Sequence, residues 1–243
     1  MNQLSSITEN CALCGHLFQG TQLTASAALG TSPDLDTRQG GYARTAIFLT
    51  IQHCKECGYC STKLNMAPEG TRQIVESESY RAILANNKLH EVARHFNCAA
   101  LIKTQTGDPG SAGWLLLTAA WLCDDRKAHD NARNFRIQTI QQWLLAGRKG
   151  QGFARDRAQE GLLLVDLYRR CGEFGQGIAL AQDVYSGLYR LPDDQQKLPT
   201  AVLHMQSHLC SLQDARAYRM DDVIKYSQAP KAWKPRRFWQ VWR

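Results

Sequence analysis

The chain has 243 residues, of which 44% are hydrophobic and 21% are charged. A chain of this length and composition buries a sizeable core, which excludes a protein that is disordered throughout. The net charge of +7 is uneven, since residues 1–70 carry −1, residues 71–224 carry +2 and residues 225–243 carry +6. The basic character therefore belongs mainly to the C-terminal segment and favours an anionic partner there.

The sequence gives no sign of export or of a membrane span. Its most apolar run, Ala112–Cys123, has 12 residues, whereas a span needs about 18 or more. Residues 1–10 lack the basic and then apolar pattern of a secretory signal. We therefore expect a cytoplasmic protein without a membrane partner, in which the nine cysteines are reduced.

Residues 1–70 are rich in Cys, Gly, Ser and Thr and predict a small β module. The clearest predicted strand is Thr45–Gln52, where β-branched and aromatic residues gather before a cysteine. A shorter strand is predicted around Gln22–Ala25.

Two Cys-x-x-Cys-Gly motifs stand at Cys11 to Gly15 and at Cys54 to Gly58. Two residues between thiolates let one tight turn place both sulfurs on one ion, and the glycine that follows permits a positive φ. Four soft ligands suit tetrahedral zinc. The predicted ligands are Cys11, Cys14, Cys54 and Cys57.

A site closed by four thiolates leaves no position for water or substrate, so we expect structural zinc and no enzymatic activity. Motifs of hydrolases, phosphate-binding loops and metalloproteases are missing from the sequence, and no small-molecule substrate is expected. Two alternatives stay open: an iron–sulfur cluster that includes the nearby Cys60, and two accidental cysteine pairs in a reduced core.

The segment between the two motifs contains Ser32-Pro-Asp-Leu-Asp-Thr-Arg38. Asp34, Asp36 and Arg38 are predicted to form an internal ion pair that organises this loop. A small binding site is the alternative interpretation.

Residues 71–224 are predicted to be helical, because apolar residues recur at spacings of three and four, as at Ala132, Phe135, Thr139 and Trp143. Breaks are predicted at residues 107–110, 147–152, 171–172 and 191–194. The short connections favour antiparallel helical hairpins. Around residues 164–184, aromatic and small residues follow a tetratricopeptide-like pattern, with an irregular helical bundle as the alternative.

The order of these motifs resembles an uncharacterised bacterial domain-of-unknown-function family. The resemblance rests on the double Cys-x-x-Cys-Gly motif, the Asp-Leu-Asp-Thr-Arg segment and Ala119-Ala-Trp-Leu-Cys-Asp-Asp125, and it covers about residues 11–222. It implies a zinc ribbon followed by tetratricopeptide-like helices, and it implies no activity. Cys60 departs from the family pattern, as do Ala12 and Lys55 where prolines are expected.

Eight cations form a basic cluster within residues 126–157. It is predicted either to contact a nucleic acid or other partner or to be a solvated helix face. The candidate contact residues are Arg126, Lys127, Arg133 and Arg136.

Residues 225–243 interleave cations with aromatic residues, which can pair with phosphates and stack on bases. The aromatic residues could instead fold back onto an apolar groove, and a membrane-surface role is a third interpretation. The candidate contact residues are Lys231, Trp233, Lys234, Arg236, Arg237, Phe238, Trp239 and Trp242.

The sequence therefore predicts a mainly α protein with three parts: a zinc ribbon (residues 1–70), a helical-repeat domain (71–224) and a basic-aromatic tail (225–243). We expect an adaptor whose helical surface binds a protein partner and whose tail binds an anionic partner. The alternative is a nucleic-acid-binding subunit of a ribonucleoprotein complex. That architecture is similar to the large subunit of type IV CRISPR effectors, although no motif of that group is matched.

Overall fold

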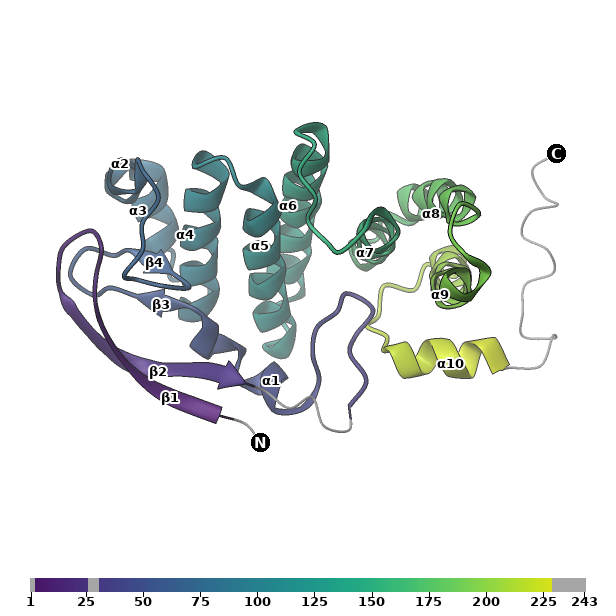
Figure 1. Cartoon of the computed structure of the whole chain (residues 1–243), viewed down its shortest axis with the longest axis horizontal. Helices are drawn as coiled ribbons and strands as arrows, with labels where there is room; N and C mark the ends of the chain where they lie inside the picture. Colours follow the sequence, from purple (N-terminus) through teal and green to yellow (C-terminus); the bar gives the residue numbers. More distant parts are fainter. Residues whose placement is uncertain (1–2, 26–30, 229–243) are drawn as a thin grey trace. The chain divides into compact units, whose positions relative to one another are not determined.

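The computed structural model describes residues 3–25 and 31–228 and confirms a mainly helical protein with a small N-terminal β part (Figure 1). In these two ranges no helix is both long and apolar enough to cross a membrane. The chain divides into two compact units, residues 1–31 with 39–153, and residues 32–38 with 154–243. This division differs from the predicted boundaries at residues 70 and 224, because the β module packs onto helices of its own unit.

The β module consists of two short antiparallel hairpins. Strand β1 (Gln3–Asn10) pairs with β2 (Leu17–Ala25), and β3 (Gln52–His53) pairs with β4 (Cys60–Ser61). The strand predicted around Gln22–Ala25 is the end of β2.

The strand predicted at Thr45–Gln52 is wrong. These residues form the end of α1 (Gly41–Thr45), the 3₁₀ helix η1 (Ile47–Thr50) and only the first residue of β3. The hydroxyls of Thr45 and Thr50 donate to carbonyls three residues earlier, at 3.0 and 2.7 Å. Such local hydrogen bonds compete with a strand, and β-branched residues favour a strand only where a neighbouring strand pairs with them.

Five helices follow the β module in the first unit, and α4, α5 and α6 lie side by side (Figure 1). The predicted break at residues 107–110 separates α4 from α5, and Asp108 caps α5 by accepting from the Ser111 N–H at 3.0 Å. The helices are α2 (Thr71–Glu76), α3 (Glu78–Leu84), α4 (Glu91–Gln105), α5 (Pro109–Asp125) and α6 (His129–Arg148).

Aromatic side chains fill the core between α5 and α6. Trp143 is fully buried and stacks on Phe153 with ring centroids 4.5 Å apart, while Trp114 meets Trp143 edge to face at 4.9 Å. The indole N–H of Trp143 donates to the Gly110 carbonyl at 3.2 Å. Gly113 lets α5 approach this ring, because a Cβ atom there would lie 2.2 Å from Nε1 of Trp143.

The second unit contains four helices among its described residues: α7 (Arg157–Arg170), α8 (Phe174–Leu188), α9 (Asp193–Ser211) and α10 (Met220–Gln228). The breaks predicted at residues 171–172 and 191–194 separate α7 from α8 and α8 from α9. Gly161 packs against Val184, and Gly177 against Cys210, so α7–α9 approach closely. The tetratricopeptide-like character stays a prediction.

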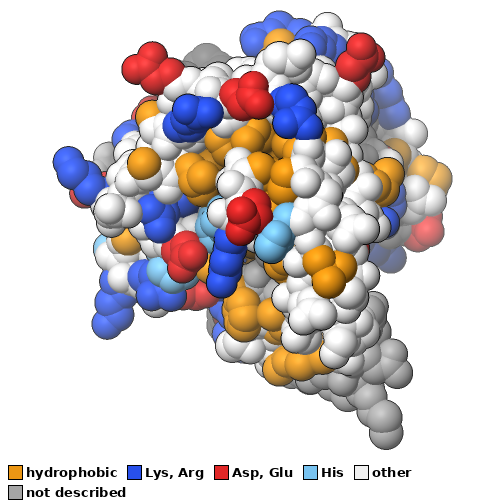
Figure 2. Space-filling model, turned by 90° about the vertical axis from the view of Figure 1, so that its left-hand side faces the viewer, with side chains coloured by type: hydrophobic (Ala, Val, Ile, Leu, Met, Phe, Trp, Pro, Cys, Tyr) orange, Lys and Arg blue, Asp and Glu red, His pale blue; other side chains and the backbone are white. Residues whose placement is uncertain are grey.

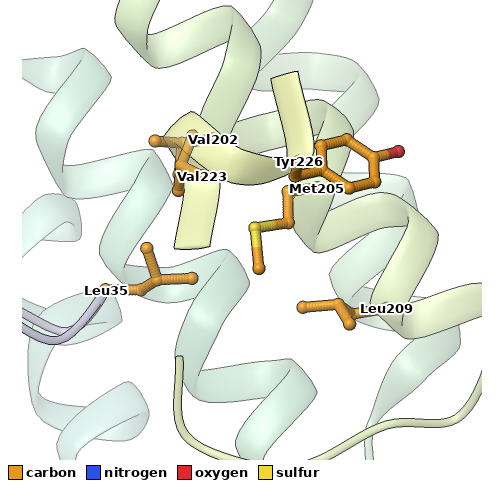
Figure 3. Packing of buried hydrophobic residues seen from close by; sticks show 6 residues of the cluster. All are labelled: Leu35, Val202, Met205, Leu209, Val223 and Tyr226. Atoms are coloured by element: carbon orange, nitrogen blue, oxygen red, sulfur yellow. The ribbon is translucent and has the colours of Figure 1, made fainter. Parts of the chain in front are cut away.

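The loop at residues 32–38 belongs to this second unit, although it lies between the two cysteine motifs in sequence. Its backbone pairs with the segment before α10: Leu35 N–H donates to the Tyr218 carbonyl and Met220 N–H to the Pro33 carbonyl, each at 2.9 Å. Leu35 joins a buried cluster with α9 and α10 side chains (Figure 3), namely Val202, Met205, Leu209, Val223 and Tyr226. The predicted tail begins at residue 225, so its first residues, including Tyr226, belong to α10.

Both aspartates of this loop are buried and form ion pairs with arginines of the C-terminal helical unit. Asp36 lies 4.0 Å from the guanidinium of Arg170, and Asp34 lies 3.9 Å from that of Arg219. The backbone N–H of Arg38 donates to Asp36 at 3.3 Å, and the Arg38 side chain is only 1% exposed. The charged residues of the loop therefore anchor it within the second unit.

Candidate metal centre

The first cysteine motif is the turn that joins β1 to β2. The Cys11 N–H donates to the His16 carbonyl at 2.9 Å, and the Gly15 N–H donates back to the Cys11 carbonyl at 2.8 Å. Gly15 has φ +75°, a left-handed conformation in which a side chain is strained. This tight turn aims the thiols of Cys11 and Cys14 to one side.

The second motif repeats the same turn between β3 and β4. Cys54 N–H donates to the Tyr59 carbonyl and Gly58 N–H to the Cys54 carbonyl, each at 2.8 Å, and Gly58 has φ +79°. The two motifs therefore have the same hydrogen-bond pattern, and we call each of them a knuckle.

The structure brings together all four cysteines that the spacing predicts as ligands. Their Sγ atoms all lie within 4.8 Å of one another, and the pairs Cys11–Cys57 and Cys14–Cys54 are 3.6 Å apart. Metal–sulfur bonds of about 2.3 Å at tetrahedral angles place sulfurs about 3.8 Å apart. The four-cysteine cluster therefore has the dimensions of a tetrahedral metal site, and all nine cysteines are free thiols.

The local environments of the four thiols differ. Cys11 and Cys54 are buried, Cys57 is half-buried and Cys14 is exposed, so the cluster reaches the surface at Cys14. Burial raises the pKa of Cys54 and Cys57, whereas the backbone N–H of His16 lowers the pKa of Cys14. Because metal ligation requires thiolates, binding of an ion here releases protons and weakens as the pH falls.

Several hydrogen bonds tie the knuckles to each other and to the helices. The Ala12 N–H of the first knuckle donates to the Leu64 carbonyl at 2.8 Å, and the Leu64 N–H donates to the Gln52 side chain at 2.8 Å. The hydroxyl of Tyr80 in α3 donates to the Gly58 carbonyl at 2.9 Å and accepts from the Cys60 N–H at 3.0 Å. An ion in the cluster would therefore order the ribbon against α3.

Cys60 lies outside the four-cysteine cluster. Its thiol donates to the Gly58 carbonyl at 3.5 Å, and its side chain is buried. Tyr80, which holds the second knuckle through its hydroxyl, is a residue that sequence analysis did not identify. A lone tyrosine in a helical pattern carries no signal for such a contact.

The predicted basic cluster is not one patch. Arg126, Lys127 and Arg133 are exposed at the α5–α6 turn, while Arg148 and Lys149 lie at the other end of α6. A helix of 20 residues separates these two groups by about 30 Å. Two more, Arg155 and Arg157, belong to the second unit.

The structure corrects the prediction that Arg136 is one of the contact residues. It is 2% exposed, and its guanidinium forms two hydrogen bonds to the Asp124 carboxylate, one of them at 3.2 Å. Arg136 faces the core because it occupies the apolar stripe of α6, one position after Phe135. It is therefore unavailable to a partner on the surface.

The eight candidate residues between Lys231 and Trp242 lie outside the described part of the chain. On the face of the molecule in Figure 2, positively and negatively charged side chains are interspersed around an area of hydrophobic side chains. That face therefore offers no surface of a single charge sign.

No protein-family model, curated protein or solved structure matches this chain.

Proposed function

We propose that this protein is a non-catalytic adaptor, in which zinc in the four-cysteine cluster holds the N-terminal ribbon in shape and the helical hairpins present a surface to a protein partner. The observation that carries the proposal is the set of four sulfurs within 4.8 Å of one another. Four donors fill a tetrahedral zinc ion, so the ion supplies folding free energy and leaves no position for substrate. Thiolate ligands favour zinc over harder cations.

The helices of the second unit carry features of a partner surface. Large apolar side chains are exposed on or beside α8, α9 and α10: Tyr189 at 67%, Leu198 at 53% and Ile224 at 51%. Exposed apolar and aromatic groups of this kind contribute most of the binding free energy at protein interfaces.

A partner test uses the full chain and the variant Tyr189→Ala, with Tyr42→Ala in the other unit as the control. A partner recovered from a cell extract at high salt, and lost on Tyr189→Ala but not on Tyr42→Ala, supports the adaptor. Retention of every recovered partner by Tyr189→Ala contradicts a role for this surface.

The second candidate function is a nucleic-acid-binding subunit. It is favoured by the exposed cations at the α5–α6 turn and by five cations in residues 229–243. Binding to RNA and to single-stranded and double-stranded DNA is measured across a salt series, with and without residues 229–243. The truncation must begin after Gln228, because Tyr226 is buried in the helical core.

A nucleic-acid-binding subunit binds with a steep salt dependence. Removal of the tail flattens the log–log slope by about 0.7–0.9 for each phosphate that the tail neutralises. A matched variant, Trp233→Ala with Trp239→Ala, lowers affinity for single strands and leaves that slope unchanged, because stacking releases no counterions. Absence of binding at low salt eliminates this candidate and leaves the adaptor.

A further inference from the structure

A second group of metal-donor side chains lies beside the second knuckle. His53 and Cys60 are directly paired residues of β3 and β4. Successive side chains of a strand point to opposite faces, so His53 faces away from the side on which Cys54 joins the four-cysteine cluster. His95 of α4 meets them on that other face.

Three donor atoms are close enough to share an ion. One ring nitrogen each from His53 and His95 and the Sγ of Cys60 all lie within 4.8 Å of one another. The two imidazole rings stack with centroids 4.3 Å apart and planes inclined by 27°. In tetrahedral zinc sites the donors lie about 3.4–3.6 Å apart, so closing onto an ion requires movements of about 1 Å.

A fourth donor stands one helical turn beyond His95. Cys98 is fully buried, as is Cys60, and it lies three residues after His95 in α4. Residues three apart on a helix share a face, so His95 and Cys98 both point toward the β3–β4 hairpin. Two imidazoles and two thiols are a ligand set that suits zinc.

A carboxylate also lies beside this group. Oε1 of Glu91, one turn before His95, is 3.9 Å from its Nε2. A carboxylate next to a metal-binding histidine orients the ring and offsets the positive charge of the ion.

We propose that His53, Cys60 and His95 bind a second zinc ion, with the Cys98 thiol as its fourth donor, so that the ion fastens the second knuckle to helix α4. Two donors come from the hairpin and two from the helix. On binding, the thiols of Cys60 and Cys98 lose their protons to solvent and the imidazoles bind as neutral rings. This site goes beyond the proposed function, which requires only the four-cysteine cluster.

The first test counts ions in the full chain after chelation and reloading with zinc. The wild-type protein is expected to hold about two zinc ions per chain, and His95→Ala, Cys60→Ala and Cys98→Ala about one each. The matched controls are His90→Ala, a histidine at the start of the same helix, and Cys123→Ala, a buried thiol in α5; both keep the wild-type count.

The second test uses cobalt, whose absorption reports the ligand set and also shows whether a variant is folded. The wild-type spectrum is expected to contain a four-sulfur component and a component from two nitrogens and two sulfurs at shorter wavelength. His95→Gln, which keeps most of the side-chain volume, loses only the second component. A wild-type spectrum that lacks the four-sulfur component but keeps the second component would contradict the proposed function and leave the second site standing.

A single ion in the wild-type protein with a purely four-sulfur spectrum overturns the proposal. So does a count of two ions in both His95→Ala and Cys60→Ala. Two ions in Cys98→Ala alone overturn the assignment of the fourth donor.

Discussion

The two units differ in what holds their interiors together. The N-terminal unit gathers sulfur donors at its ribbon and stacks aromatic rings such as Trp143 and Phe153 between its helices. The C-terminal unit contains an ion pair with both members buried: Arg169 and Asp166 are 0% and 1% exposed, and their side chains lie 2.6 Å apart. Arg169 also donates to the carbonyls of Asp214 and Arg216 at 2.9 and 2.7 Å.

Because of this difference, the stability of each unit depends on a different condition. A metal ion whose ligands come from separate turns supplies folding free energy only while it is bound. A buried ion pair with hydrogen bonds to backbone carbonyls costs little while complete and much when one partner is lost. The first unit should therefore respond to chelators and the second to removal of a charge.

The largest expected effect is loss of a cysteine ligand. Cys57→Ser removes the ion from the four-cysteine cluster, where structural zinc sites contribute about 10–16 kcal/mol in small domains. We expect the ribbon to unfold while the helices of the second unit persist, as measured by metal content and by hydrogen exchange of both units. Cys123→Ala, which removes a buried thiol outside the cluster, keeps the ion. A Cys57→Ser protein with wild-type exchange in residues 3–25 would refute the structural role of the metal.

The next largest loss of stability is expected from breaking the buried ion pair between Asp166 and Arg169. Asp166→Ala leaves the Arg169 guanidinium buried without its carboxylate, and should lower the free energy of unfolding of the C-terminal unit by about 3–5 kcal/mol. The exposed pair Arg155–Asp156 is the control, because Arg155→Ala should cost less than about 1 kcal/mol. Denaturant melts measure both. Equal losses in the free energy of unfolding for the two variants would show that burial of an ion pair does not determine the cost of removing one partner.

Leu35→Ala tests the loop that lies between the knuckles in sequence but packs in the second unit. Leu35 is 6% exposed, and its truncation should cost about 2–5 kcal/mol in the C-terminal unit. The zinc content should not change. Leu4→Ala, at a side chain that is 50% exposed, should change stability by no more than about 0.5 kcal/mol. Loss of zinc from Leu35→Ala would show that the loop supports the zinc ribbon and would contradict its assignment to the C-terminal unit.

A pair of glycine substitutions tests the aromatic core of the first unit. Gly113→Ala forces a Cβ atom into the Trp143 ring and should destabilise by about 1–3 kcal/mol. Gly147→Ala, in the same helical hairpin but with nothing within 4 Å of the added Cβ, should stabilise by about 0.4–1 kcal/mol. Thermal melts of the two variants should therefore shift in opposite directions, and shifts in the same direction would contradict the close packing at Trp143.

The smallest expected effect is shared by both units and depends on pH. A hydrogen bond from the Gln159 N–H lowers the pKa of Asp156. For Asp108, burial raises the pKa, but hydrogen bonds from Ser111 and from the Lys103 ammonium outweigh this effect, so the net shift of the pKa is downward. A lowered folded pKa gives stability that is present above the unfolded value of about 3.9 and is lost as the pH falls through the folded value.

Each of these aspartates caps a helix, α5 or α7, so replacement by Ala should cost about 1 kcal/mol at neutral pH. The cost should shrink in acid, where the wild-type carboxylate is itself protonated. Thermal melts of Asp108→Ala and Asp156→Ala at several pH values measure this. A cost that stays constant below the folded pKa would contradict a contribution from the charged cap.

The sequence predicted the parts of the molecule that depend on local spacing. The two knuckles are set by residues three apart and a following glycine, and the helices by the recurrence of Ala132, Phe135, Thr139 and Trp143, all of which are buried. Of the β1–β2 hairpin only the end of β2, around Gln22–Ala25, is predicted from the sequence, because the hairpin lacks a regular alternation of large apolar and polar side chains. Leu4 and Leu17, two of its apolar residues, are 50% and 52% exposed.

The features that depend on tertiary structure could not be predicted. The proposed donors His53, Cys60 and His95 come from two strands and a helix, so no motif of fixed spacing in the sequence predicts that they lie close together. The eight cations of residues 126–157 are contiguous in sequence, but the length of α6 separates them. The loop at residues 32–38 packs with residues almost two hundred positions later, as in the hydrogen bond from the Asp221 N–H to the Ser32 hydroxyl.

The most direct test of the central claim is anomalous diffraction at the zinc edge from crystals of the full chain. The account predicts a peak about 2.3 Å from each of the four sulfurs of Cys11, Cys14, Cys54 and Cys57, with no water or other ligand on the ion. A cluster without a peak, or an ion that holds only three of these sulfurs and a water molecule, would contradict it.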